Sequence, residues 1–123
     1  MEDCKDLDIL SVTTTVASRV DAEVLARAIL ERRLGACVQV EEGLTSCYHW
    51  QGRDCEEPEL RLTIKTLRAC APALLALFAE RHPYEVPQFL GVTMQASPAY
   101  FDWVAQQVSQ PHAAGTLDGS VPR

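Results

Sequence analysis

The segment His82-Pro83-Tyr84-Glu85-Val86-Pro87 has the residue types that most clearly suggest chemistry. It places an imidazole, a phenol and a carboxylate between two prolines, which restrict the backbone of the loop. A neutral imidazole and a carboxylate held in this way are suitable ligands for a divalent metal. The alternative interpretation is a stiff connector between a helix and a strand, in which Tyr84 packs and His82 and Glu85 form hydrogen bonds across a subunit contact.

Cys37 is a second residue whose type suggests metal chemistry. It follows Leu34-Gly35-Ala36, at the expected start of a strand. One interpretation is a buried strand cysteine that acts as a small hydrophobic residue. The other is a soft metal ligand that meets His82, provided that both lie at one end of the sheet. A thiolate there would favour copper or zinc over magnesium or calcium.

A catalytic interpretation uses the same three side chains. Cys37 as nucleophile, His82 as base and Glu85 as the group that orients the base would imitate a thiol hydrolase. However, the sequence has no nucleophile elbow, glycine-rich phosphate loop or evident oxyanion site. We therefore expect no enzymatic activity and no catalytic residues.

Two further cysteines, Cys47 and Cys55, flank a predicted hairpin turn. They would form a redox pair or a second soft-metal site only if the turn brought them together, and a slip of one residue would point them to opposite faces. Between and beyond them runs an acidic stretch, which we interpret as a solvated hairpin end; it comprises Asp54, Glu56, Glu57 and Glu59.

The composition is that of an ordinary globular chain. Its 123 residues, 47% hydrophobic and 23% charged, suit one domain with one core. The net charge of -6 argues against a nucleic-acid partner. No stretch approaches the length of a membrane-spanning helix, and the acidic start of the sequence has no apolar signal core. We expect a cytoplasmic protein with no membrane partner.

Hydrophobic spacing predicts the order strand, helix, strand, strand, helix, strand, helix. The strands are expected at residues 7–16, 36–50 (with a kink at Gly43), 59–66 and 88–95. The first helix is capped by Ser18 and stopped by Gly35, the second runs over 67–81 with Thr66 as its cap, and the third starts at Pro98 and ends near Val108. We expect a single domain over residues 7–109, flanked by disordered segments 1–6 and 110–123.

This order predicts an α+β, ferredoxin-like βαββαβ sandwich with an additional C-terminal helix and a long hairpin between the second and third strands. Right-handed crossovers place both main helices on one face of the sheet. The other face then lacks cover, and the aromatic side chains of Tyr48 and Trp50 add to its apolar surface. We therefore expect a homo-oligomer.

Four motifs in this sequence resemble, in order and spacing, the CutA divalent-cation tolerance family. The resemblance extends over about Ile9 to Val108, and its motifs are Leu34-Gly35-Ala36-Cys37-Val38, Thr45-Ser46-x-Tyr48-x-Trp50-x-Gly52, Ile64-Lys65-Thr66 and His82-Pro83-Tyr84-Glu85-Val86-Pro87.

The resemblance implies a homotrimer like that of the PII signalling proteins and a role in tolerance to divalent metals, copper above all. It implies Cys37, His82 and Glu85 as the metal contacts, contributed by one subunit or by adjacent subunits. Tyr48, Trp50 and Tyr84 resemble packing residues of the trimer. No organic cofactor is expected, and copper(II) or another divalent ion is the candidate ligand.

The sequence departs from the family pattern at two positions. Gln39 stands where the family usually has asparagine, and Gln88 replaces an acidic residue, which removes a charge beside the implied site and should weaken the binding of hard cations. The alternative function is a PII-like regulatory trimer that binds a small molecule between subunits and signals to a protein partner. Lys65 and Arg68 are the expected donors to an anionic ligand of that kind.

Overall fold

The computed structural model describes residues 7–108, so the predicted disordered segments 1–6 and 110–123 lie outside the described residues. Within this range, four antiparallel strands form one sheet in the order β2-β3-β1-β4. The strands are β1 (Asp8–Val16), β2 (Cys37–Trp50), β3 (Arg53–Thr66) and β4 (Leu90–Gln95). The predicted central position of the first strand is confirmed, because β1 pairs with both β3 and β4.

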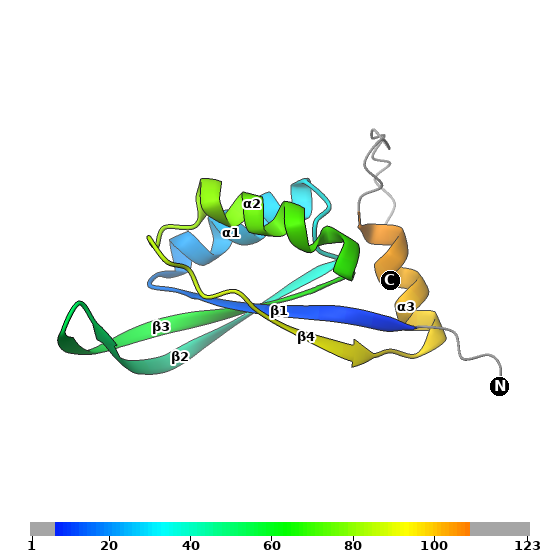
Figure 1. Cartoon of the computed structure of the whole chain (residues 1–123). Coiled ribbons are helices and arrows are strands. Elements are labelled where there is room, and N and C mark those ends of the chain that lie inside the picture. The colour runs from blue at the N-terminus through cyan, green and yellow to red at the C-terminus, as the bar shows by residue number, and fades with distance from the viewer. Residues whose placement is uncertain (1–6, 109–123) are drawn as a thin grey trace.

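The helices in the described part of the chain are α1 (Arg19–Glu31), the short 3-10 helix η1 (Arg68–Cys70), α2 (Ala71–Arg81) and α3 (Pro98–Gln107). Helices α1 and α2 cover one face of the sheet, and α3 lies at the end of the sheet where β1 begins (Figure 1). This order of elements and strands is that of the predicted ferredoxin-like fold with an additional C-terminal helix.

The side chains of β1 alternate between the two faces of the sheet. Val12, Thr14 and Val16 are fully buried at 0% exposure, and both valines belong to the core cluster that includes Leu25 and Leu77 of the two helices. The intervening residues point to the opposite face, which we call the open face. At one end of the open face, Ile9 is covered by Val104 of α3, in a second and smaller core cluster.

Helix α1 begins where the sequence predicts, but it ends for a different reason. The Ser18 hydroxyl accepts a hydrogen bond of 3.1 Å from the backbone N–H of Asp21, as an N-cap should. After Glu31 the chain turns through Arg33, which has a φ of 56°. The predicted stop at Gly35 is therefore made two residues earlier, by the left-handed conformation of Arg33. Gly35 is needed because a Cβ atom there would lie 2.8 Å from Cγ2 of Ile64.

Strands β2 and β3 form a hairpin longer than the sequence predicts. The predicted kink at Gly43 is confirmed, since this residue has a φ of 88° and the register shifts between Glu41 and Leu44. The third strand, however, begins at Arg53 instead of at residue 59. Pro58 and its acidic neighbours are uncommon inside strands, but a hairpin strand tolerates such residues where they face solvent.

The connection from β3 to α2 also differs from the prediction. Thr66 does not cap the helix, because it is the last residue of β3 and its hydroxyl donates a 2.8 Å hydrogen bond to the carbonyl of Leu34. The short helix η1 follows, and α2 starts at Ala71. The predicted end of the helix at Arg81 is confirmed, with Pro83 two residues beyond it.

The open face carries a row of apolar side chains along β4. Leu90, Val92 and Met94 are 58%, 59% and 44% exposed, and all three stand opposite open-face positions of β1.

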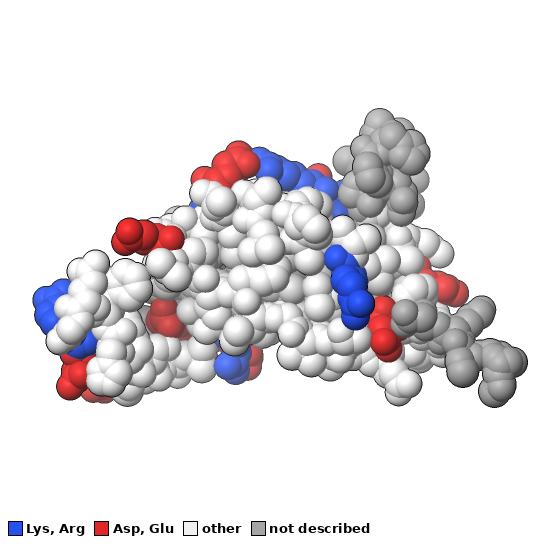
Figure 2. All heavy atoms as spheres, viewed as in Figure 1, with Lys and Arg blue, Asp and Glu red and all other residues white. Residues whose placement is uncertain are grey.

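In the view of Figure 2, lysine and arginine side chains are scattered between uncharged areas and form no continuous band. Between residues 7 and 108, no helix has the length and apolar character needed to span a membrane.

Candidate functional site

His82 links the central strand to the loop that follows α2. Its Nδ1 accepts a 3.1 Å hydrogen bond from the backbone N–H of Tyr84, so Nε2 carries the hydrogen and donates it to Thr14 Oγ1 at 2.9 Å. The ring is 9% exposed and lies 5.3 Å from the ring of Phe78. Burial lowers the pKa of His82 below its ordinary value, so the imidazole is neutral at pH 7.

This link sets the position of the loop, and the loop places Tyr84 against β3. The Tyr84 hydroxyl donates a 2.5 Å hydrogen bond to Oε2 of Glu59, while Ser46 Oγ donates to Oε1 of the same carboxylate at 2.7 Å. Glu59 is only 7% exposed. Burial and the hydrogen bond to Glu59 raise the pKa of Tyr84, which therefore stays protonated as a donor.

Glu59 has no basic partner among the described residues, although it is buried. The ion pairs found in that part of the chain join other carboxylates, such as Glu41 with Arg61 and Glu80 with Arg32. The two donors to Glu59 are neutral hydroxyl groups. The buried negative charge is therefore hydrogen-bonded but not balanced by a nearby cation.

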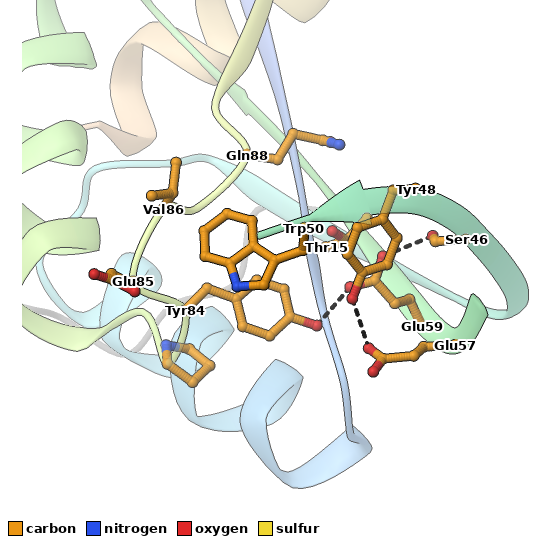
Figure 3. Close-up of a pocket in the computed structure, with 11 residues that line it drawn as sticks. Thr15, Ser46, Tyr48, Trp50, Glu57, Glu59, Tyr84, Glu85, Val86 and Gln88 are labelled. Carbon is orange, nitrogen blue, oxygen red and sulfur yellow. Dashed lines mark hydrogen bonds between the residues drawn. The ribbon is translucent and has the colours of Figure 1, made fainter. Parts of the chain in front are cut away.

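Glu59 lies in the wall of a cavity of about 490 Å³ between the hairpin and the loop after α2 (Figure 3). Figure 3 shows Tyr48, Trp50 and Tyr84 around this cavity, with Glu57 beside Tyr48. The hydroxyl of Tyr48 donates a 2.8 Å hydrogen bond to Glu57, which raises the pKa of Tyr48 to about 12. The full lining consists of Thr15, Ser46, Tyr48, Trp50, Glu57, Glu59, Pro83, Tyr84, Glu85, Val86 and Gln88.

The charged side chains in the lining are all acidic, and no lysine or arginine is among them. Glu57, Glu59 and Glu85 supply three carboxylates. The cavity belongs to the open face, because Thr15 and the alternate residues of β3 point to that side. A cavity of this charge attracts cations and repels anions.

The structure does not bring the predicted metal ligands together within one chain. Cys37 stands opposite Lys65, which in turn stands opposite Ser11, so its thiol points to the open face. His82 lies on the helix side, in contact with Thr14. Residues 7–108 contain no group of three or more His, Cys, Asp or Glu side chains placed to hold a metal. A site made of these ligands therefore requires adjacent subunits.

The same geometry bears on the other interpretations of the cysteines. A thiol hydrolase would need Cys37 within hydrogen-bond reach of His82, and the two side chains lie on opposite sides of the sheet. In the hairpin, Cys47 stands opposite Glu56 whereas Cys55 stands opposite Tyr48, so the two thiols point to opposite faces. The redox or metal pair considered for Cys47 and Cys55 is not formed within one hairpin.

The prediction that Glu59 belongs to a solvated acidic hairpin end was wrong. Glu59 is buried beneath Tyr84, although Asp54, Glu56 and Glu57 are exposed as expected. Its hydrogen bond from Ser46 depends on the register of β2 against β3, which shifts between Glu41 and Leu44 and which the sequence does not specify. The available signal was alternation, because Ser46, Tyr48 and Trp50 recur every second residue and share a face.

The chain is a ferredoxin-like α+β protein in which a long hairpin and a proline-bracketed loop enclose an acidic cavity. Comparison with known proteins identifies its family. Residues 10–107 match the family described as CutA1 divalent ion tolerance protein. The chain belongs to this family, as the sequence motifs predicted.

Individual relatives agree with this assignment. The Divalent-cation tolerance protein CutA of Thermus thermophilus is 38% identical over 96 residues, which are 77% of this chain and 93% of that protein. Protein CutA of Mus musculus is also 38% identical over 96 residues, but the match covers only 54% of its length, so this chain spans about half of the mouse relative. An Arabidopsis thaliana relative, 30% identical over 84% of this chain and 57% of its own, is named chloroplastic. The predicted cytoplasmic location therefore stays a prediction.

Solved structures of CutA proteins show the same fold. The divalent cation tolerance protein from Thermus thermophilus matches with a TM-score of 0.79 and 36% identity, over 82% of this chain and 99% of that chain. CutA from Synechococcus elongatus PCC7942 matches with a TM-score of 0.78 and 38% identity, over 84% and 92% of the two chains.

Proposed function

We propose that this protein is a homotrimer that binds a divalent cation, with copper(II) as the first candidate. The observation that carries the proposal is the acidic cavity, whose lining includes the carboxylates of Glu57, Glu59 and Glu85 and no basic residue. Relatives named for divalent-cation tolerance support it. Glu85, one of the three predicted ligands, is an exposed residue of this lining.

The exposed apolar side chains of the open face support assembly into an oligomer. Leu90, Val92 and Met94 expose a continuous apolar row on β4, and the outer edge of this strand has no partner strand within the described chain. Covering these three side chains with other subunits removes apolar area from water and pairs the free edge. Tyr48 and Trp50, each 39% exposed, line the cavity instead, and their packing role in the trimer stays a prediction.

The predicted metal ligands Cys37, His82 and Glu85 would have to approach one another across subunits. The thiol of Cys37 favours copper and already points to the face through which the subunits would meet. His82 can act as a ligand only if it loses one of its two ring hydrogen bonds. We therefore expect Cys37 and Glu85 to contribute directly and His82 to contribute mainly by positioning the loop.

The cavity also favours a second function, the binding of a small molecule by a PII-like trimer that signals to a partner. A volume of about 490 Å³ is in the range of small-ligand sites. The anionic ligand expected for Lys65 and Arg68 would meet neither of these cations in this cavity, because neither residue lines it. Lys65 instead donates to Gln39 at 3.2 Å, and Arg68 to Thr93 at 3.4 Å.

Copper affinity measured by chelator competition tests the metal proposal. We expect Cys37→Ser and Glu85→Gln each to weaken copper binding by about tenfold or more, because each removes a direct ligand. Cys47→Ser is the matched control, since its thiol is also accessible but lies on the hairpin. Affinity unchanged in Cys37→Ser, or reduced equally in Cys47→Ser, would contradict the proposed site.

A further inference from the structure

The cavity between the hairpin and the loop is walled by aromatic rings as well as by carboxylates. Tyr48 and Trp50 are two residues apart on β2, and Tyr84 reaches the cavity from the loop after α2 (Figure 3). Aromatic faces attract cations through their quadrupole, most strongly in tryptophan. Rings around an anionic wall are the combination that recognises alkylated ammonium groups.

The electrostatics of the wall favour a positive ligand. Glu59 is buried without a basic partner in the described chain, and its oxygens are held by Ser46 and Tyr84. Glu57 is held by Tyr48. These bonds fix the direction of each carboxylate but leave its charge, so a cation that enters the cavity meets oriented negative groups that need little rearrangement.

The geometry within one chain suits an organic cation better than a bare metal ion. A metal ion requires several ligand atoms at about 2.0 to 2.6 Å, and the described residues include no cluster of acidic, histidine or cysteine side chains that meets this need. A cavity of about 490 Å³ is also much larger than an ion. Its size and aromatic walls instead match a polyatomic cation that carries apolar groups.

We propose that this cavity binds a small organic cation bearing a quaternary or alkylated ammonium group. The ammonium lies between Trp50 and Tyr84, with Glu57 and Glu59 supplying the opposite charge. The proposal rests on the second, small-molecule function and names its ligand class. The cavity shares Glu85 with the proposed metal site, but the ligand proposal does not require Cys37 or His82, which do not line the cavity.

Choline and its neutral carbon analogue, 3,3-dimethylbutanol, are the probes that test this site, because they have the same shape and differ in charge. Trp50 and Trp103 are the two tryptophans of the chain, so a Trp103→Phe background makes Trp50 fluorescence report on the cavity. With metal-free protein in a chelator, choline is expected to change this signal saturably at millimolar concentration. The neutral analogue should bind at least about fivefold more weakly. Equal binding of both probes, or no response to choline, would overturn the proposal.

A pair of neighbouring glutamates provides the matched variants. Glu57→Gln removes a charge from the cavity, whereas Glu56→Gln removes the same charge from the other face of the exposed hairpin, opposite Cys47. We expect Glu57→Gln to weaken choline binding several-fold and Glu56→Gln to change it by less than about twofold, as screening of an outer charge predicts. Equal effects of the two variants would mean that net charge alone attracts choline, and they would contradict the proposed site.

Two outcomes separate this proposal from the metal proposal. Cys37→Ser is expected to bind choline as the unchanged protein does, even if it no longer binds copper. If a basic side chain of a neighbouring subunit fills the cavity, choline will fail to bind although copper still does, and the ligand proposal alone is then contradicted.

Discussion

The imidazole of His82 connects the central strand of the sheet to the loop that forms one wall of the cavity. Both ring nitrogens take part, one with Thr14 and the other with the backbone of Tyr84. This arrangement requires the neutral ring, because a protonated Nδ1 cannot accept a hydrogen bond. His82 therefore supports the cavity through the position of Tyr84, whether or not it also contacts a metal.

The stability of the protein should depend on pH through His82. Burial lowers the folded-state pKa of this group below the 6.5 of an ordinary histidine, so the unfolded chain binds the proton more readily. Its contribution is fully present above pH 6.5, falls as the pH drops below 6.5, and levels off below the folded pKa. We expect the free energy of unfolding, measured by denaturant titration from pH 7.5 down, to decrease in this window.

Carboxylates also titrate at acidic pH, so the comparison with variants decides the cause. His82→Gln cannot titrate and should flatten the part of the pH dependence just below 6.5. His49→Gln is the matched control, because His49 has a side chain that is 86% exposed and pairs only with exposed Asp54. A slope unchanged in His82→Gln would show that His82 does not link pH to stability.

At the scale of elements, the contact between α1 and the sheet depends on Gly35. A Cβ atom at this position would lie 2.8 Å from Ile64 on β3 and 3.0 Å from Ile29 on α1. Both isoleucines are fully buried, so neither can move without disturbing the core. The turn after α1 can therefore approach the sheet only with glycine at this position.

Gly35→Ala is expected to destabilise the fold by roughly 1 to 3 kcal/mol, the usual cost of overpacking a core. Gly91→Ala is the matched control on β4. Its Cβ would meet only Leu10 Cδ1 at 3.3 Å, the end of a flexible side chain, so we expect a change of less than about 1 kcal/mol. Thermal or denaturant unfolding of both variants measures the difference. Equal losses would mean that the close approach at residue 35 is relieved by backbone movement.

The order of elements could be predicted from the sequence because each element carries a local signal. Ser18 marks the start of α1, Pro83 follows the end of α2, and alternation marks the inner part of β3. The outer part of β3 was missed because Pro58 and its acidic neighbours are residue types that are uncommon in strands. A long cross-strand ladder with β2 decides the matter there, and local propensity does not.

The site was predicted less completely than the fold. The loop from His82 to Pro87 was identified by its unusual composition, and the structure places Glu85 and Tyr84 in the cavity lining. The burial of Glu59 could not be predicted, since it results from the loop, β2 and β3 meeting in space. Contact of Cys37 with the other predicted ligands depends on subunits that one sequence does not specify.

At the scale of the whole molecule, the two faces of the sheet have different partners. The helices bury one face, including Val12 and Val16 at 0% exposure. On the open face, α3 covers only the end near Ile9, and the apolar row of β4 stays in water. A monomer would keep this apolar area exposed at a cost of about 25 cal/mol for each Å². The proposed association through β4 would remove that cost.

The most direct test of a copper-binding homotrimer is a native mass spectrum of the reduced protein, recorded without copper and with one equivalent per chain. We predict a species of three times the 13.6 kDa chain that takes up a whole number of copper ions. Val92→Glu, which places a charge in the β4 row, should shift the mass toward the monomer. Val24→Glu, on a similarly exposed part of α1, should leave the trimer intact. A monomeric wild-type protein, or a trimer that takes up no copper, would contradict the account.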